Sequence, residues 1–215
     1  AGVIGGSGSS AFTKQGAGTM TLSGANTYTG ATTVEGGTLI ARHSTALGTV
    51  AGGTTVASGA TLQLENNISV GAEALALQGT LRSASGTNAY AGAISGTGQV
   101  TIDAGTFTLS GSGANTYTGV TTLESGTLDL AKSSGVVAVS GNLVIGNGSG
   151  AATVRLVNAN QIGDTSAVTL ASGGTPVLNL NNQSDTIGSL ASANTAAAVQ
   201  LGSGATLALG GTFSE

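Results

Sequence analysis

A long internal repeat constrains the fold of this chain more than any other feature. Residues 25–39, ANTYTGATTVEGGTL, recur with few changes as residues 114–128, ANTYTGVTTLESGTL. Just upstream, residues 19–24 (TMTLSG) match residues 106–111 (TFTLSG). A chain that repeats itself at this length stacks equivalent units on one another, so the repeat predicts a repetitive architecture.

Within and between these units, apolar and polar residues alternate, as Met20 and Leu22 do with the threonines beside them. The same spacing occurs in Val100/Ile102, Phe107/Leu109, Leu143/Ile145, Val154/Leu156, Leu178/Leu180 and Val199/Leu201. Successive side chains of a strand point to opposite faces, so each pair predicts one buried strand face. Residues 191–198 contain helix formers, but the stretch is short and interrupted by Ser192 and Asn194, which favours a loop.

Clusters of glycine and asparagine separate the alternating runs. They are Gly52-Gly53, Asn66-Asn67, Asn147-Gly148, Gly173-Gly174 and Asn181-Asn182. Both residue types tolerate positive φ, which sharp corners require. Short strands joined by such corners are typical of a sandwich, a barrel or a solenoid. The self-similar units, the uncharged outward positions and the single proline, Pro176, favour the solenoid. We therefore predict an all-β, parallel β-helix of roughly ten coils and about 50 Å in length.

The composition excludes several other classes. Gly is 38 of 215 residues, while charged residues are 7% and hydrophobic residues 40%. Disordered chains are rich in charge and poor in such apolar residues, and collagen needs a Gly-X-Y period that is absent here. The net charge is −4 and the five Lys and Arg are scattered, so neither nucleic-acid binding nor a basic membrane-surface patch is expected. With no Cys, disulfides and thiolate metal sites are excluded.

Residues 14–39, KQGAGTMTLSGANTYTGATTVEGGTL, closely resemble the passenger-associated transport repeat, also called the autotransporter-associated β-strand repeat. That repeat combines a Lys-x-Gly-x-Gly-Thr-Leu-Thr-Leu-Ser-Gly run with Asn-Thr-Tyr-x-Gly and a closing Gly-Thr-Leu. Residues 105–128 resemble a second copy, which lacks the Lys and carries a Ser112-Gly113 insertion. Residues 179–190 are similar to linking coils of the same proteins.

The resemblance implies the passenger domain of an outer-membrane type V secretion protein. It further implies a right-handed β-helix, an extracellular location at the bacterial cell surface and a repeat that carries no catalytic residues. We expect residues 1–215 to form a single β-helix segment, an excerpt of a longer passenger. Membrane contact is expected only through a C-terminal barrel, which this sequence lacks.

Nine carboxylates are the candidates for sugar cleavage, which usually needs two acids. They are Glu35, Glu65, Glu73, Asp103, Glu124, Asp129, Asp164, Asp185 and Glu215. Glu35 and Glu124 occupy the same position of the repeat, which indicates a scaffold role. Coiling brings distant residues together, however, so a polysaccharide-cleaving β-helix enzyme stays an alternative.

No other residue group predicts a site. His43, the single histidine, is followed by Ser44, but no nucleophile elbow accompanies them, so we interpret it as a solvated loop residue. Tyr28, Tyr117 and Tyr90, the last in a weaker echo at residues 87–92, are interpreted as corner packing rather than an exposed binding ladder. Thr-x-Thr pairs are too sparse for an ice-binding array, and the glycine-rich stretches lack the Asp of calcium-binding rolls. We therefore predict no catalytic, cofactor-binding or metal-binding residue.

The sequence thus predicts a non-enzymatic stalk or adhesin-type segment that supports surface display, adhesion, or biofilm or fibre formation. Its expected partners are a host or neighbouring-cell surface or the extracellular matrix. End-to-end self-association into a filament is the first alternative, because open solenoid ends leave backbone groups unpaired. The sugar-cleaving enzyme is the second.

Overall fold

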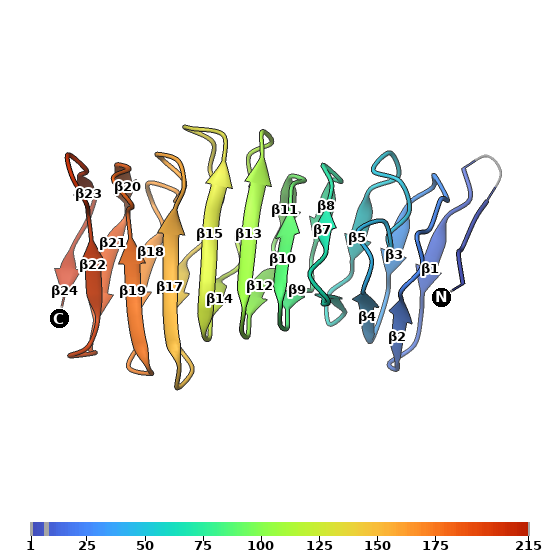
Figure 1. Ribbon diagram of the computed structural model, residues 1–215, viewed down its shortest axis with the longest axis horizontal. Coiled ribbons are helices and arrows are strands. Elements are labelled where there is room, and N and C mark those ends of the chain that lie inside the picture. Colours follow the sequence, from blue (N-terminus) through green and yellow to red (C-terminus); the bar gives the residue numbers. More distant parts are fainter. Residues whose placement is uncertain (1, 7–8, 215) are drawn as a thin grey trace.

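The chain folds as a β-solenoid. The computed structural model describes residues 2–6 and 9–214. Throughout this part of the chain every regular element is a strand, and the sheets are parallel and stack in about 10 turns. The coils follow one another along a rod, with the two ends of the chain at its opposite ends (Figure 1). The predicted all-β, parallel β-helix is confirmed.

The strands lie on three faces, which we call A, B and C in the order in which the chain visits them. Face B is one sheet of ten strands. Its strands are β2 (Thr19–Leu22), β4 (Thr38–Ala41), β6 (Thr61–Leu64), β9 (Thr80–Ser83), β12 (Gln99–Ile102), β14 (Thr121–Leu123), β16 (Leu143–Ile145), β18 (Ala167–Leu170), β21 (Ser189–Ser192) and β24 (Phe213–Ser214). This sheet is the continuous backbone of the rod.

Face C is a sheet of seven strands, whereas face A is interrupted. Face C contains β7 (Ser69–Val70), β10 (Thr87–Tyr90), β13 (Thr106–Gly111), β15 (Gly126–Lys132), β17 (Ala151–Leu156), β19 (Thr175–Asn179) and β22 (Ala198–Gln200). Face A contains β1 (Phe12–Lys14), β3 (Thr32–Val34), β5 (Thr54–Val56), β8 (Leu75–Leu77) and β11 (Ile94–Gly96), then β20 (Asp185–Ile187) and β23 (Leu207–Leu209). A parallel bridge between Val139 and Ile162 lies between these two groups.

Inward side chains of successive coils stack in register and form the core. On face B, Leu39 pairs with Leu62 and Leu62 with Leu81, and all three are 0% exposed. Each fully buried leucine contributes roughly 1.5–3 kcal/mol to folding. The predicted alternation is confirmed in the middle of the rod but is wrong for Met20, Val199 and Leu201, which are 40%, 37% and 39% exposed. These three lie near the ends of the described rod, and Met20 and Val199 each pair with a strand on one side only.

Outward threonines also stack in rows. Face B aligns Thr19, Thr38, Thr61 and Thr80, and face C aligns Thr87, Thr106, Thr127 and Thr153. The adjacent outward row of face B carries Thr21, Ile40, Gln63 and Arg82 instead. The rows are therefore single, and the surface lacks a regular two-row threonine array along these coils.

Glycines stack at the A/B corner because the preceding coil occupies the space of a side chain. A Cβ on Gly98 would lie 2.3 Å from the carbonyl oxygen of Gly79, and one on Gly119 would lie 2.0 Å from that of Gly98. Gly141 repeats the contact with the Gly119 oxygen at 2.1 Å. Close coil stacking at this edge thus requires glycine at these positions.

Asparagine pairs form two of the other corners. Asn66-Asn67 and Asn181-Asn182 all have positive φ, between 50° and 71°. In both pairs the first side-chain amide donates to a carbonyl of the preceding coil, and the second accepts a backbone N–H of the following coil. The predicted positive φ is wrong at Asn147-Gly148, where Gly146 adopts it instead (φ 83°).

The two repeat copies lie on different faces of the rod. In the first copy, β2, β3 and β4 lie on faces B, A and B, whereas in the second, β13, β14 and β15 lie on faces C, B and C. Equivalent residues Thr32 and Thr121 are 89 positions apart, which spans four coils and one further face. The repeat therefore specifies a local corner and not a fixed position around the axis.

Candidate functional site

The tyrosines of the two repeat copies are structural. Tyr28 and Tyr117 are 1% and 0% exposed, and their hydroxyls hydrogen-bond to Thr32 Oγ1 (2.7 Å) and Thr121 Oγ1 (2.6 Å). Tyr90 is equally buried, but among the described residues its hydroxyl has no hydrogen-bond partner. The predicted corner packing is confirmed, and these side chains form no exposed ladder.

The asparagine that precedes each of these tyrosines bridges two coils. Asn26 Oδ1 accepts the Ile4 N–H (2.8 Å), and its Nδ2 donates to the Ala46 carbonyl (2.7 Å). Asn115 makes the same pair of bonds, with Ile94 at 2.9 Å and Ala138 at 2.7 Å. The best-matched residues of the repeat thus satisfy buried backbone groups and leave no side chain for chemistry.

Three of the carboxylates form ion pairs with an arginine of a neighbouring coil. The pairs are Arg42–Glu65 (2.7 Å), Arg82–Asp103 (2.5 Å) and Arg155–Asp129 (2.7 Å). Glu35 accepts a bond from Gln15 (2.9 Å) and Glu124 one from Asn147 (3.2 Å). Because the copies are rotated by one face, Glu35 and Glu124 lie on different corners. Asp164 lies in an exposed turn, and Glu215 lies outside the described residues.

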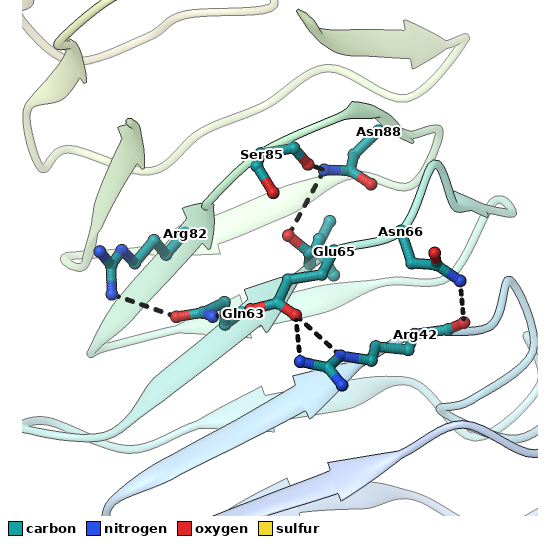
Figure 2. Close-up of polar contacts among 8 residues, drawn as sticks. Arg42, Gln63, Glu65, Asn66, Arg82, Ser85 and Asn88 are labelled. Atoms are coloured by element: carbon teal, nitrogen blue, oxygen red, sulfur yellow. Dashed lines mark hydrogen bonds and ion pairs between the residues drawn. The ribbon is translucent and has the colours of Figure 1, made fainter. Parts of the chain in front are cut away.

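Two of these ion pairs belong to a polar ladder at the end of face B, beside the B/C corner. Gln63 lies between them: its amide nitrogen donates to Glu65, and its oxygen accepts from Arg82 Nη1 (3.1 Å). Figure 2 shows Arg42 reaching Glu65 and Arg82 reaching Gln63 from the neighbouring coils. Ion pairs on a surface contribute only about 0–1 kcal/mol each, so the ladder defines a surface pattern more than it stabilises the fold.

The Arg42–Glu65 pair of this ladder lines a polar groove. The groove is lined by Ser23, Arg42, Glu65, Asn66, Asn67, Ser85 and Gly86, which we call the B/C groove. Arg42 is 47% exposed in its side chain, and no second carboxylate accompanies Glu65 there. Beneath the rim, Asn88 donates to the Ser85 carbonyl (2.8 Å) and fixes that wall (Figure 2). Arginine, amide and hydroxyl groups at one open surface suit a polar macromolecular contact.

Two ionisable side chains without an opposite charge lie inside the rod. Glu73 is 2% exposed and accepts a hydrogen bond from the Thr54 hydroxyl, and burial raises its pKa to about 7. Lys132 is 0% exposed and donates to the carbonyls of Gly92 (3.2 Å) and Ser110 (2.9 Å), and burial lowers its pKa to about 8. Sequence reasoning missed both residues. The signal for Lys132 was the spacing of two that it shares with the buried Leu128 and Leu130, whereas no such alternation marks Glu73.

Asp185 is a further buried charged residue, 3% exposed on face A, and Lys14 (5%) and Asp129 (8%) are buried as well. Its carboxylate accepts the backbone N–H groups of Gln161 (2.8 Å), Ile162 (3.1 Å) and Thr186 (2.8 Å). Burial raises its pKa, and these three bonds oppose that rise. The carboxylate therefore satisfies backbone N–H groups of the preceding coil and of its own strand.

His43 and Ser44 do not form a nucleophile–base pair. His43 Nδ1 contacts the amide (3.2 Å) and hydroxyl (3.1 Å) of Thr45, while Ser44 Oγ accepts the Ser69 N–H (3.0 Å). Over residues 2–6 and 9–214, no three His, Cys, Asp or Glu side chains cluster as metal ligands. The same residues contain no helix of the length and apolarity that crossing a membrane requires.

Comparison with known proteins identifies the repeat. Residues 12–41 and 100–130 match the sequence model of the passenger-associated-transport-repeat. The chain thus carries two copies of this autotransporter passenger repeat, as its resemblance indicated. No curated protein and no solved structure matches the chain.

Proposed function

We propose that this chain, which carries two copies of the passenger-associated-transport-repeat, is a stalk or adhesin-type segment of a secreted bacterial surface protein. Its place would be outside the cell, exported by type V secretion and displayed at the outer membrane. The observation that carries the proposal is the unbroken ten-stranded sheet of face B. A solenoid whose successive coils are joined by main-chain hydrogen bonds along its whole length is a rigid spacer, suited to hold a contact surface away from a cell.

The B/C groove is the surface we propose for that contact. It combines an exposed arginine with amide and hydroxyl groups, and it lies at the corner that follows the strands of face B. The proposed partners are a host or neighbouring-cell surface or the extracellular matrix.

Adhesion of protein-coated beads to cultured cells and to immobilised matrix tests this role. We expect wild-type beads to bind well above albumin-coated beads, and Arg42→Gln with Asn66→Gly to reduce binding at least about threefold. Arg155→Gln is the matched control, because it removes an equally exposed arginine from a similar ion pair on face C. Binding no better than albumin would contradict an adhesive role, and an equal loss in the control would contradict the groove.

A second candidate is end-to-end self-association, in which the last coil of this segment pairs with another copy. Leu209 and Phe213 are 38% and 54% exposed, although their register partners Ile187 and Leu190 are buried. Apolar side chains on unpaired edge strands favour strand addition by a second copy.

Light scattering over a concentration series separates this candidate from a simple stalk. Assembly predicts particles that lengthen with concentration and revert to single rods with Phe213→Asp. Val120→Asp, at an exposed valine (38%) far from the ends, should leave assembly unchanged. Single rods at every concentration would rule out assembly by this chain.

The sugar-cleaving alternative gains no support from the described residues. It required two acids facing one cleft, whereas three carboxylates lie in arginine pairs and two are buried. The repeat itself is a structural passenger element. We therefore propose that the segment acts by contact and not by catalysis.

A further inference from the structure

Glu73 stands at an unusual position in the C/A corner. The amides of Thr32, Thr54 and Leu75 bond to the carbonyls of residues 53, 74 and 93, which places residues 52, 73 and 92 in one column. The other members of this column are Gly52 and Gly92, and a Cβ on Gly52 would lie 2.2 Å from the Gly30 oxygen below it. A carboxyl side chain therefore occupies a place where neighbouring coils carry none.

The surroundings of this carboxyl suit its neutral form. Its hydrogen-bond partner is the hydroxyl of Thr54, and its negative charge contributes to the raised pKa of two phenols, Tyr28 and Tyr90. The hydroxyl of Tyr90 is buried without a partner among the described residues. The cation on this corner is Lys132, whose ammonium group bonds to the Gly92 carbonyl beyond the glutamate and to that of Ser110. An ionised Glu73 would thus be a buried charge without an ion-pair partner.

A path to water lies beside it. Glu73 lines a surface groove on the coils of β3 to β8, together with Ser44, Thr49, Val50, Ser69 and Gly71. Thr49 Oγ1, also in this lining, is buried without a hydrogen-bond partner among the described residues. A carboxylate that leaves Thr54 therefore finds both a hydroxyl and solvent within the groove.

We propose that Glu73 is a proton-operated latch on the corner formed by residues 71–74. When the carboxyl is neutral, it stays hydrogen-bonded to Thr54 and holds the corner closed. When it ionises by releasing its proton to solvent, the carboxylate turns into the groove and frees the corner. The closed state has a raised pKa of about 7, whereas the open, solvated carboxyl has the ordinary value of 4.5. Opening is therefore increasingly favoured as pH rises from 4.5 to 7 and levels off above 7.

Hydrogen exchange at the two amides beside the latch tests the proposal. The Thr54 N–H bonds to the Ala74 carbonyl (2.8 Å) and the Leu75 N–H to the Ala93 carbonyl (2.9 Å). After correction for intrinsic rates, we expect their protection to fall at least about tenfold between pH 5 and pH 8. Glu73→Gln should abolish the fall, while Asp103→Asn, which removes a surface carboxylate, should retain it.

Two results would overturn the latch. One is equal protection of these amides at both pH values in the wild type. The other is a fall in their protection in Glu73→Gln that is as large as in the wild type. Should that variant not fold, carboxyl carbon NMR of the wild type decides, because an ordinary Glu73 pKa near 4.5 contradicts the latch. The outcome is independent of the adhesive role.

Discussion

At the scale of single residues, hydrogen-bond partners separate three tyrosines that look alike in the sequence. Tyr28 and Tyr117 have a threonine four residues later, whereas Tyr90 has Ile94 there. The first two hydroxyls are paired with those threonines, and the third has no partner among the described residues. A buried hydroxyl without a partner loses its bonds to water and gains nothing in return.

The same substitution should therefore have opposite effects at two positions. Tyr117→Phe leaves Thr121 Oγ1 without its partner and is expected to destabilise the fold by about 1 kcal/mol or more. Tyr90→Phe removes an unpaired hydroxyl and is expected to be neutral or stabilising. Urea unfolding of both variants measures the difference, and an equal loss of stability in the two would contradict the assignment.

At the scale of elements, each corner combines a backbone requirement with a bridge between coils. Asparagine pairs supply positive φ together with side-chain bonds to both neighbours, and glycine columns supply close approach. The effect of a substitution on stability therefore depends on its position in the stack of corner residues, and not on residue type alone.

Two glycine-to-alanine changes make this concrete. In Gly119→Ala the new methyl group would lie 2.0 Å from the Gly98 oxygen, so we expect a loss of several kcal/mol or a failure to fold. In Gly18→Ala no atom lies within 4 Å of the methyl group and φ is not positive, so the change should stabilise by about 0.4–1 kcal/mol. Thermal or urea unfolding reports both, and a benign Gly119→Ala would refute the close stacking of this corner.

At the scale of the whole molecule, the two uncompensated buried charges act on stability in opposite directions. Glu73 has a folded pKa of about 7, above its ordinary 4.5, so stability is lost as pH rises from 4.5 to 7. Lys132 has a folded pKa of about 8, below its ordinary 10.5, so its burial penalty applies below pH 8 and is relieved above it. Together they predict a stability minimum between pH 7 and 8.

Urea unfolding at intervals from pH 5 to 9.5 measures this minimum. On each side of the minimum, the free energy of unfolding should change by no more than about 3 kcal/mol, since one pKa unit corresponds to about 1.4 kcal/mol. Glu73→Gln should flatten the acid flank alone, and Lys132→Met the alkaline flank alone. A stability maximum near pH 7 in the wild type would show that other groups dominate the titration.

The strand pattern of this molecule was predictable because it depends on local spacing. The alternation of apolar and polar residues is a property of the extended chain, so buried pairs such as Phe107/Leu109 follow from spacing alone. The repeat sequence also predicted a corner, and in the structure Asn115 and Tyr117 form hydrogen bonds to nearby groups at that corner. The candidate site was not predictable, because Arg42, Gln63 and Arg82 meet only across coils of varying length.

The sequence by itself determined the strand pattern, the sharp corners and the repetitive class of fold. Only the tertiary structure decided which face each repeat copy occupies, which arginine meets which carboxylate, and that Glu73 is buried. The physical reason is that register on face A advances by 19 to 22 residues per coil, from Thr32 to Thr54, Leu75 and Ile94. These differences accumulate around the axis, so pairing between coils, and not local spacing, sets where each side chain lies.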